Sequence, residues 1–169
     1  MSARKKPVKD GKQGKHEWIK HLQFCRVREN NQELVRGYFL SQFVNAPEEF
    51  YEFLKALRET LSKKDSGAQY RDLAVKYGSV ISSLAERFGY YGEKLGLDDL
   101  CFSIMDPRRY SRILNLLKDY QKKSKKLLDA IHKKLDGALQ EVGVKYTLKG
   151  RFKSISSIAK KMEKKRRQT

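Results

Sequence analysis

The chain has 169 residues and a formal net charge of +18; 39% of its residues are apolar and 11% are aromatic. This length fits one compact domain, or a small domain with arms, and the aromatic content argues against a wholly disordered chain. No stretch is long and apolar enough for a membrane span or a signal peptide, and two cysteines make no disulfide framework. We therefore expect a cytoplasmic protein with no membrane partner.

The positive charge is concentrated at the two ends of the chain. Residues 1–15 carry a net charge of +5, residues 16–105 carry −1, and residues 106–169 carry +14. Cationic ends favour polyanionic partners such as nucleotides, RNA, the ribosome or anionic lipid. A basic surface that is simply solvated is the alternative.

The first 105 residues divide into a tail and a helical region. Residues 1–15 contain Lys, Gly and Pro and almost no apolar side chains, which predicts a disordered basic tail. Residues 16–105 have apolar side chains at helical spacing, which predicts a small bundle, with Pro47 in the first turn of one helix. The apolar residues at helical spacing are Trp18, Leu22 and Cys25 (or Ile19 and Leu22), then Leu34, Tyr38, Phe39, Phe43, Phe50, Phe53, Leu54, Leu57, Leu61, Leu73, Val80, Ile81, Leu84, Ala85 and Phe88.

Turn-forming residues set the expected helix boundaries in this region. Residues 65–67 break the helix that precedes them, and residues 68–88 form the next one. Gly89 and Gly92 are expected to end it, because glycine is common after the last turn of a helix. Residues 93–105 predict a further short helix.

Residues 106–143 predict a long helix. Asp106 and Pro107 suit its cap and first turn, and Gly143 is a natural stop. Gln121 and Ser124 stand where apolar residues are due, which indicates a kink or an exposed stretch. The apolar stripe comprises Tyr110, Ile113, Leu114, Leu117, Tyr120, Leu127, Leu128, Ile131, Leu135 and Leu139.

The last segment, residues 144–169, has a different pattern of apolar and polar residues. Alternating residues over 144–148 predict a strand, residues 150–154 a turn, and residues 155–167 a helix. A lone strand needs a partner for its backbone groups, so this end looks like the opening of a domain whose remainder is missing. The chain as a whole is expected to be mainly α, a helical bundle with a long connector helix that ends in a single strand–turn–helix.

The turn before the last helix carries the strongest chemical signal. Gly150 allows close approach of the backbone to a ligand, Arg151 and Lys153 sit on the turn, and Ser157 and Lys161 lie one helical turn apart. Cations and a hydroxyl beside a helix N-terminus suit a triphosphate. A basic turn that only meets solvent is the competing interpretation.

Residues 150–162, GRFKSISSIAKKM, resemble the first motif of the RelA/SpoT-type alarmone synthetases, Gly-Arg-x-Lys-x-x-x-Ser-Ile-x-x-Lys-Met. Three earlier segments agree in order and spacing with the region that joins the hydrolase and synthetase halves of the long enzymes of this family. These segments are LAERFG at 84–89, KLGLDDLCF at 94–102 and DPRRY at 106–110. The resemblance covers about residues 70–165.

The resemblance implies a fold and a site. The end of the chain would be the start of an α/β nucleotidyltransferase-like synthetase domain. In the family the residues that match Arg151, Lys153, Ser157 and Lys161 contact the ATP donor, whose pyrophosphate passes to the 3′-hydroxyl of GDP or GTP with Mg²⁺ present. This is the reaction of a GTP pyrophosphokinase, and its product is (p)ppGpp, the signal of the stringent response.

Departures from the family pattern limit the expected activity. The Mg²⁺-binding aspartate, the guanine-stacking tyrosine and the catalytic glutamate of the synthetase have no counterpart in this sequence, nor has the His-Asp motif of the hydrolase. We expect a truncated or split protein of (p)ppGpp metabolism that retains part of an ATP site and is inactive alone, with a complementing synthetase fragment as its partner. The alternative is a basic helical module that regulates through RNA, the ribosome or a partner protein.

Other candidate residues favour structural roles. His21 and Cys25 lie one helical turn apart, but two ligands do not make a metal site, so no metal site is expected. The pair Asp98 and Asp99 is expected to form a structural contact near Lys94, with acid–base catalysis as the less favoured alternative. The tyrosines Tyr90 and Tyr91 are expected at the rim of the core rather than stacked on bases, and His132 is expected at the surface.

Overall fold

The computed structural model describes residues 13–63, 67–143, 145–148, 150 and 152–168, without the side chains of residues 13 and 15. The chain separates into two compact units, Met1–Asp106 and Pro107–Thr169. Within the described ranges the regular structure is helical and no residue forms a β-strand, which confirms the mainly α class. None of the helices in these ranges is long and apolar enough to cross a membrane.

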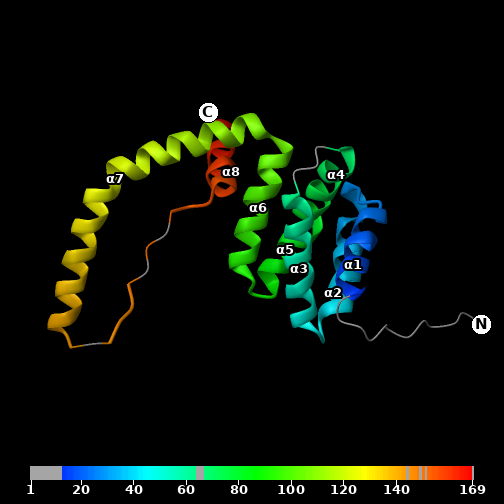
Figure 1. Cartoon of the computed structure of the whole chain (residues 1–169), viewed down its shortest axis with the longest axis horizontal. Coiled ribbons are helices and arrows are strands. Elements are labelled where there is room, and N and C mark those ends of the chain that lie inside the picture. Colours follow the sequence, from blue (N-terminus) through cyan, green and yellow to red (C-terminus); the bar gives the residue numbers. More distant parts are fainter. Residues whose placement is uncertain (1–12, 64–66, 144, 149, 151, 169) are drawn as a thin grey trace, which may run out of the picture. The chain divides into compact units, whose positions relative to one another are not determined.

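The first unit is a bundle of short helices (Figure 1). Helix α3 contacts α1 and α6, and α6 also contacts α4 and α5. A π-helical segment, Tyr77–Ile81, joins α4 to α5, so the single helix expected over 68–88 is interrupted. The helices are α1 (Gln13–Phe24), α2 (Gln32–Phe43), α3 (Pro47–Ser62), α4 (Ala68–Lys76), α5 (Ser82–Arg87) and α6 (Tyr91–Met105), with a 3₁₀ turn at Glu29–Asn31.

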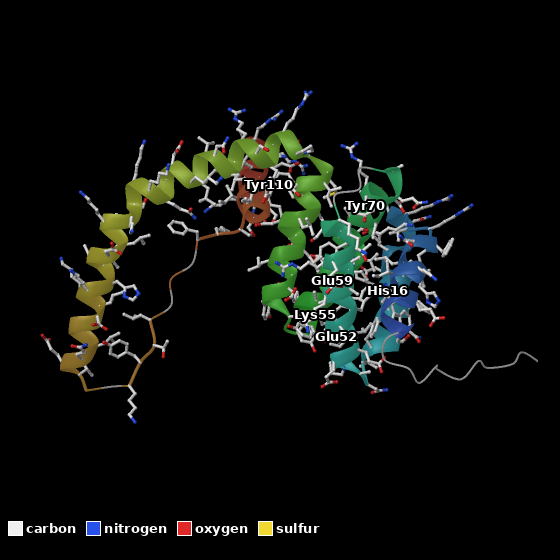
Figure 2. All side chains as sticks on the ribbon, viewed as in Figure 1. His16, Glu52, Lys55, Glu59, Tyr70 and Tyr110 are labelled. Atoms are coloured by element: carbon white, nitrogen blue, oxygen red, sulfur yellow. The ribbon has the colours of Figure 1, made fainter. Side chains whose placement is uncertain are left out.

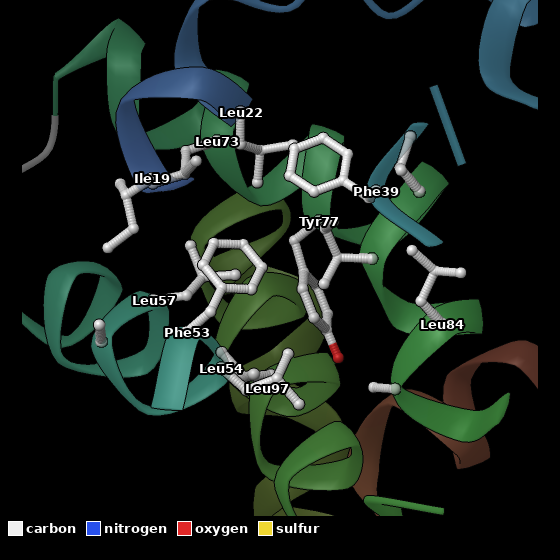
Figure 3. Packing of buried hydrophobic residues seen from close by; sticks show 14 of the residues in the cluster. Ile19, Leu22, Phe39, Phe53, Leu54, Leu57, Leu73, Tyr77, Leu84 and Leu97 are labelled. Carbon is white, nitrogen blue, oxygen red and sulfur yellow. The ribbon is translucent and has the colours of Figure 1, made fainter. Parts of the chain in front are cut away.

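Aromatic and aliphatic side chains fill the centre of this bundle (Figure 3). Phe53 stacks on both Phe39 and Phe43, with ring centroids 6.2 and 5.8 Å apart. The expected apolar face of α3 is buried along its whole length. Leu34 is 77% exposed and Tyr38 is 43% exposed, so not every apolar residue at helical spacing in α2 is buried; the buried face of α2 is the one that carries Phe39 and Phe43.

Two helix boundaries differ from the sequence-based expectation. Helix α1 begins at Gln13, so the irregular tail does not extend to residue 15; residues 1–12 lie outside the described part of the chain. Gly89 has φ of +80° and follows the last turn of α5, as expected. Gly92 instead lies inside the first turn of α6. One glycine in the left-handed region is enough to end the helix, and the second is free to continue into the next.

The second unit consists of α7 (Pro107–Glu141) and α8 (Ile155–Arg166), which contact each other. Gly143 has φ of +70° and follows the end of α7. This left-handed conformation is costly for residues that have a Cβ but not for glycine. Gly143 can therefore adopt it, and the chain leaves the helix there.

The strand expected over 144–148 does not form. Residues 145–148 are irregular, and Val144 lies outside the described residues. A strand is stable only when its backbone groups pair with a neighbouring strand, and the described residues provide none. The segment is held instead by the Tyr146 hydroxyl, which donates a hydrogen bond to the backbone oxygen of Asp136 on α7 at 3.0 Å.

The apolar stripe of α7 is largely open. Ile113 is the buried member of the stripe among the described side chains of this helix. Tyr120 and Leu127 are each 62% exposed, and Leu128, Ile131 and Leu135 are between 43% and 48% exposed. Both alternatives for the middle of this helix describe the structure: the stripe is exposed well beyond Gln121 and Ser124, and the helix bends in its middle (Figure 1).

Candidate phosphate-binding site

Helix α8 begins with a side-chain cap. Ser154 has extended backbone angles, φ −61° and ψ 152°, and its hydroxyl oxygen accepts a hydrogen bond from the backbone N–H of Ser157. The same hydroxyl donates to the Ser157 hydroxyl at 2.7 Å. Ile155 and Ser156 in the first turn are buried, so the attraction for an anion at this end comes from the positive end of the helix dipole.

Three of the expected site residues surround this helix start. Lys153 immediately precedes the cap and is exposed, Ser157 is half-buried in the first turn, and Lys161 is exposed one turn later. Residues four apart share a helix face, so Ser157 and Lys161 lie on the same side of α8. Among the described residues neither lysine has a carboxylate partner. Their ammonium groups are therefore able to bind an anion.

The other two expected residues belong to the turn. Gly150 is exposed, and a Cβ placed there would meet no atom within 4 Å. The backbone at this position is thus open to a ligand, and the neighbouring structure does not require glycine. Arg151 lies outside the described residues, so its prediction as a site residue stays a prediction.

Two residues that position α8 were not identified from the sequence. Arg109 on α7 donates a hydrogen bond from Nη2 to the backbone oxygen of Ala159 at 3.1 Å, and its Nη1 lies 3.8 Å from Glu163 Oε2. Ser154 is the cap. A signal existed for Ser154, because a serine three residues before Ser157 at a helix start is a typical cap. None existed for Arg109, whose partner is a backbone atom 50 residues away.

An apolar groove lies between α7 and α8 next to Lys153. Its volume is about 740 Å³. Its polar lining residues are Ser124 and Lys153; the others are Ile113, Leu116, Leu117, Tyr120, Leu127, Leu128, Ile131, Phe152, Ile158 and Met162. The candidate phosphate site therefore combines a helix N-terminus and two lysines with an apolar surface on one side.

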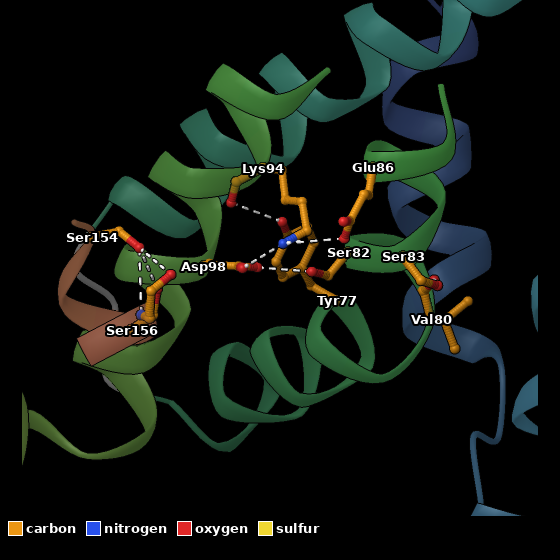
Figure 4. Close-up of polar contacts among 10 residues, drawn as sticks. Tyr77, Val80, Ser82, Ser83, Glu86, Lys94, Asp98, Ser154 and Ser156 are labelled. Atoms are coloured by element: carbon orange, nitrogen blue, oxygen red, sulfur yellow. Dashed lines mark hydrogen bonds and ion pairs between the residues drawn. The ribbon is translucent and has the colours of Figure 1, made fainter. Parts of the chain in front are cut away.

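The first unit places Asp98 in a structural contact rather than at an open site (Figure 4). Its Oδ1 accepts a hydrogen bond from the Ser82 hydroxyl at 2.9 Å, and its Oδ2 accepts one from Lys94 Nζ at 3.1 Å. The Tyr77 hydroxyl donates to the Lys94 backbone oxygen at 3.2 Å. These contacts confirm the expected pairing of Asp98 with Lys94 and occupy both carboxylate oxygens.

Burial also changes the protonation of side chains near this network. Desolvation, and after it the negative charge of Asp98, raises the pKa of the Cys101 thiol to about 12. The same two causes raise the pKa of Tyr77 well above its usual value. Both groups are therefore neutral at physiological pH. Cys101 is thus a buried apolar side chain and not a nucleophile.

The other residues considered for a site in the sequence have structural or surface positions. The Tyr90 hydroxyl donates to the Pro47 backbone oxygen at 2.8 Å, and His132 is exposed on α7. His21 packs edge-on against Trp18, with ring centroids 5.2 Å apart. In the part of the chain that the structure describes, no three His, Cys, Asp or Glu side chains gather closely enough to hold a metal ion.

Comparison with curated proteins shows similarity over a little more than half of the chain. A guanosine-3′,5′-bis(diphosphate) 3′-pyrophosphohydrolase of Vibrio cholerae is 33% identical over 95 residues, which is 56% of this chain and 14% of that protein. The bifunctional (p)ppGpp synthase/hydrolase SpoT of Escherichia coli is 33% identical over 92 residues, 54% of this chain and 13% of that protein. A GTP pyrophosphokinase of Escherichia coli is 34% identical over 103 residues, 60% of this chain and 14% of that protein.

These similarities support a relation to the RelA/SpoT family, as the motifs predicted. The chain spans about one seventh of the length of these relatives. No protein-family profile matches the chain.

Proposed function

We propose that this chain belongs to (p)ppGpp metabolism and carries the phosphate-binding part of the ATP site of a GTP pyrophosphokinase. The start of α8 would bind the triphosphate, with Arg151, Lys153, Ser157 and Lys161 as its ligands and the open backbone at Gly150 allowing close approach. The observation that carries the proposal is this capped helix start with two lysines that have no carboxylate partner among the described residues, in a chain of which a little more than half is 33–34% identical to enzymes named for (p)ppGpp synthesis or hydrolysis.

Each residue has a role that follows from its place. The dipole of α8 attracts the phosphate to this end of the helix, and the Ser157 hydroxyl is held there by Ser154 at 2.7 Å. Lys153 and Lys161 offset the negative charge of the triphosphate from the two sides of this turn. In phosphoryl-type transfer, cations fixed in such positions stabilise the charge on the transferring group.

The site is partial, and we infer that transfer needs groups from a further polypeptide segment. Chemically, the reaction also requires an acceptor site for the guanosine nucleotide and groups that orient its 3′-hydroxyl. Mg²⁺ is expected to arrive on the nucleotide, where it neutralises phosphate charge. The relatives are about seven times longer than the matched region, which leaves ample chain for these parts in those proteins.

Calorimetric titration with MgATP tests the proposal. Wild type is compared with the double variant K153A/K161A and with the control K133A/K134A, which removes two exposed lysines from α7 and keeps the same net charge. We expect saturable binding by wild type and the control, and a dissociation constant at least about tenfold larger for the site variant, or about 1.4 kcal/mol of binding free energy. Equal affinities for the two variants, or a folded wild type that binds no MgATP, would refute it.

A further inference from the structure

The second unit carries far more charge than a triphosphate site needs. Residues 107–169 contain 20 Lys and Arg against five Asp and Glu, a net charge of +15. Glu163 is the one acidic residue in the sequence from 142 to 169. The candidate phosphate site accounts for only part of this positive charge.

Part of this charge gathers where the end of α8 meets the start of α7. The ion pair between Arg109 Nη1 and Glu163 Oε2, 3.8 Å apart, joins the two helices at this point. Arg108 and Arg112 flank Arg109 on α7, and blue-tipped side chains project from this part of the helix in Figure 2. We define the basic patch as five exposed residues on these two segments: Arg108, Arg112, Lys164, Arg166 and Arg167.

Glu163 offsets only part of the charge of the basic patch. Glu163 is already engaged: its Oε1 lies 2.7 Å from Arg167 Nη2, and its Oε2 lies 3.8 Å from Arg109 Nη1. A few cations in the last turn of α8 would complement the helix dipole. That effect accounts for neither of the arginines on α7, which lie at the opposite, N-terminal end of their own helix and are unfavourable there.

We propose that the basic patch binds the phosphate backbone of a nucleic-acid duplex. Arginine matches phosphate geometry with paired donors, and the basic patch contains three arginines besides Arg167, which Glu163 also contacts. The defined patch contains no aromatic ring on which a base could stack, and stacking is the main device of single-strand binding. A duplex presents a dense row of phosphates, one negative charge per 1.7 Å of axis, to such a surface. This proposal does not depend on the ATP site, because Lys153 and Lys161 are not part of the basic patch.

Fluorescence anisotropy with a labelled RNA duplex of about 20 base pairs tests this, with a DNA duplex of the same sequence in parallel. The patch variant R108Q/R112Q/K164Q/R166Q is compared with K118Q/K122Q/K123Q/K126Q, which removes four exposed lysines elsewhere on α7. The two variants have equal net charge. Helicity by circular dichroism, measured for both, verifies that each is folded.

For wild type we expect the logarithm of the association constant to fall with the logarithm of salt concentration at a slope of about −4, because each neutralised phosphate contributes about −0.9. The patch variant should lose about three units of this slope and at least about 50-fold in affinity at 0.1 M salt, and the control less than about tenfold. Binding to both duplexes, or to RNA alone, supports the proposal and identifies the source of the phosphates. Equal losses in the two variants would overturn it, as would tighter binding to phosphatidylserine vesicles than to either duplex.

Discussion

The guanidinium of Arg109 on α7 donates a 3.1 Å hydrogen bond to the backbone oxygen of Ala159 on α8. This bond ties the long helix to the middle of the helix whose start forms the candidate phosphate site. Ala159 lies inside α8, so Arg109 binds a backbone oxygen of that helix without interrupting it. The orientation of the site therefore depends on a residue that the phosphate itself would not contact.

Replacement of Arg109 by methionine should loosen α8, because the variant keeps the length of the side chain and loses its donors. A hydrogen bond from a charged group contributes about 1.5 kcal/mol, so amide hydrogen exchange in α8 should accelerate about tenfold. The exposed neighbour Arg112, changed to methionine, is the control and should leave exchange in α8 unchanged. Unchanged protection of α8 in R109M would show that other contacts hold the helix.

The cap at Ser154 predicts a local effect at the start of α8. Ser154→Ala removes the acceptor for the Ser157 N–H and should cost about 1 kcal/mol, seen as faster exchange in the first turn of α8. Ser154→Asp keeps an acceptor and should restore protection. The exposed Ser111 on α7, changed to alanine, controls for the loss of a hydroxyl. If S154D behaves like S154A, the role of Ser154 is not that of a cap.

The contact between Asp98 and Lys94 predicts a loss of stability in the first unit. Asp98→Asn keeps the shape of the side chain and removes the charge that pairs with Lys94, whose side chain is only 16% exposed. We expect the free energy of unfolding to fall by about 2 kcal/mol, less than for a fully buried pair because Glu86 remains 3.6 Å from Lys94. Urea denaturation measures the change, with the exposed Glu59→Gln as the control. A change within about 0.5 kcal/mol for D98N would contradict this account.

The raised pKa of Cys101, about 12, predicts both low reactivity and a pH effect. The folded protein should react with a thiol reagent such as DTNB at Cys25 alone, and at both cysteines in denaturant. Because the folded state prefers the neutral thiol, stability is full below the ordinary thiol pKa of about 9 and is lost as the pH rises towards 12. C101S should show a smaller loss over this range. Fast labelling of Cys101 in the native protein would contradict its burial.

The sequence predicted the bundle well where apolar spacing was strong. The face of α3 carrying Phe50, Phe53 and Leu57 is buried as expected, and Gly143 ends α7 as expected. In α2 the pattern was ambiguous, because Leu34 and Tyr38 also have helical spacing, and only the packing of α3 and the neighbouring helices selects which face is buried. Apolar spacing shows that a helix has an apolar face, but not how much of that face the neighbouring helices bury.

The failures concern contacts that join distant parts of the chain. Alternation over residues 144–148 indicates strand propensity, but propensity forms a strand only when a partner strand pairs with it. For the candidate site, the motif gave Lys153, Ser157 and Lys161, which the structure places around one helix start. The contact of Arg109 with α8 could not be predicted, because its partner is a backbone oxygen and any residue at position 159 would provide one.

An ¹⁵N–¹H NMR titration with MgATP tests the central claim most directly, because it reports where on the chain the nucleotide binds. The account predicts that the largest saturable shifts occur at the amides of Lys153, Ser157 and Lys161, and that K153A/K161A abolishes them while K133A/K134A does not. Shifts confined to the basic patch, or spread evenly over the lysines of α7, would contradict a phosphate site at the start of α8.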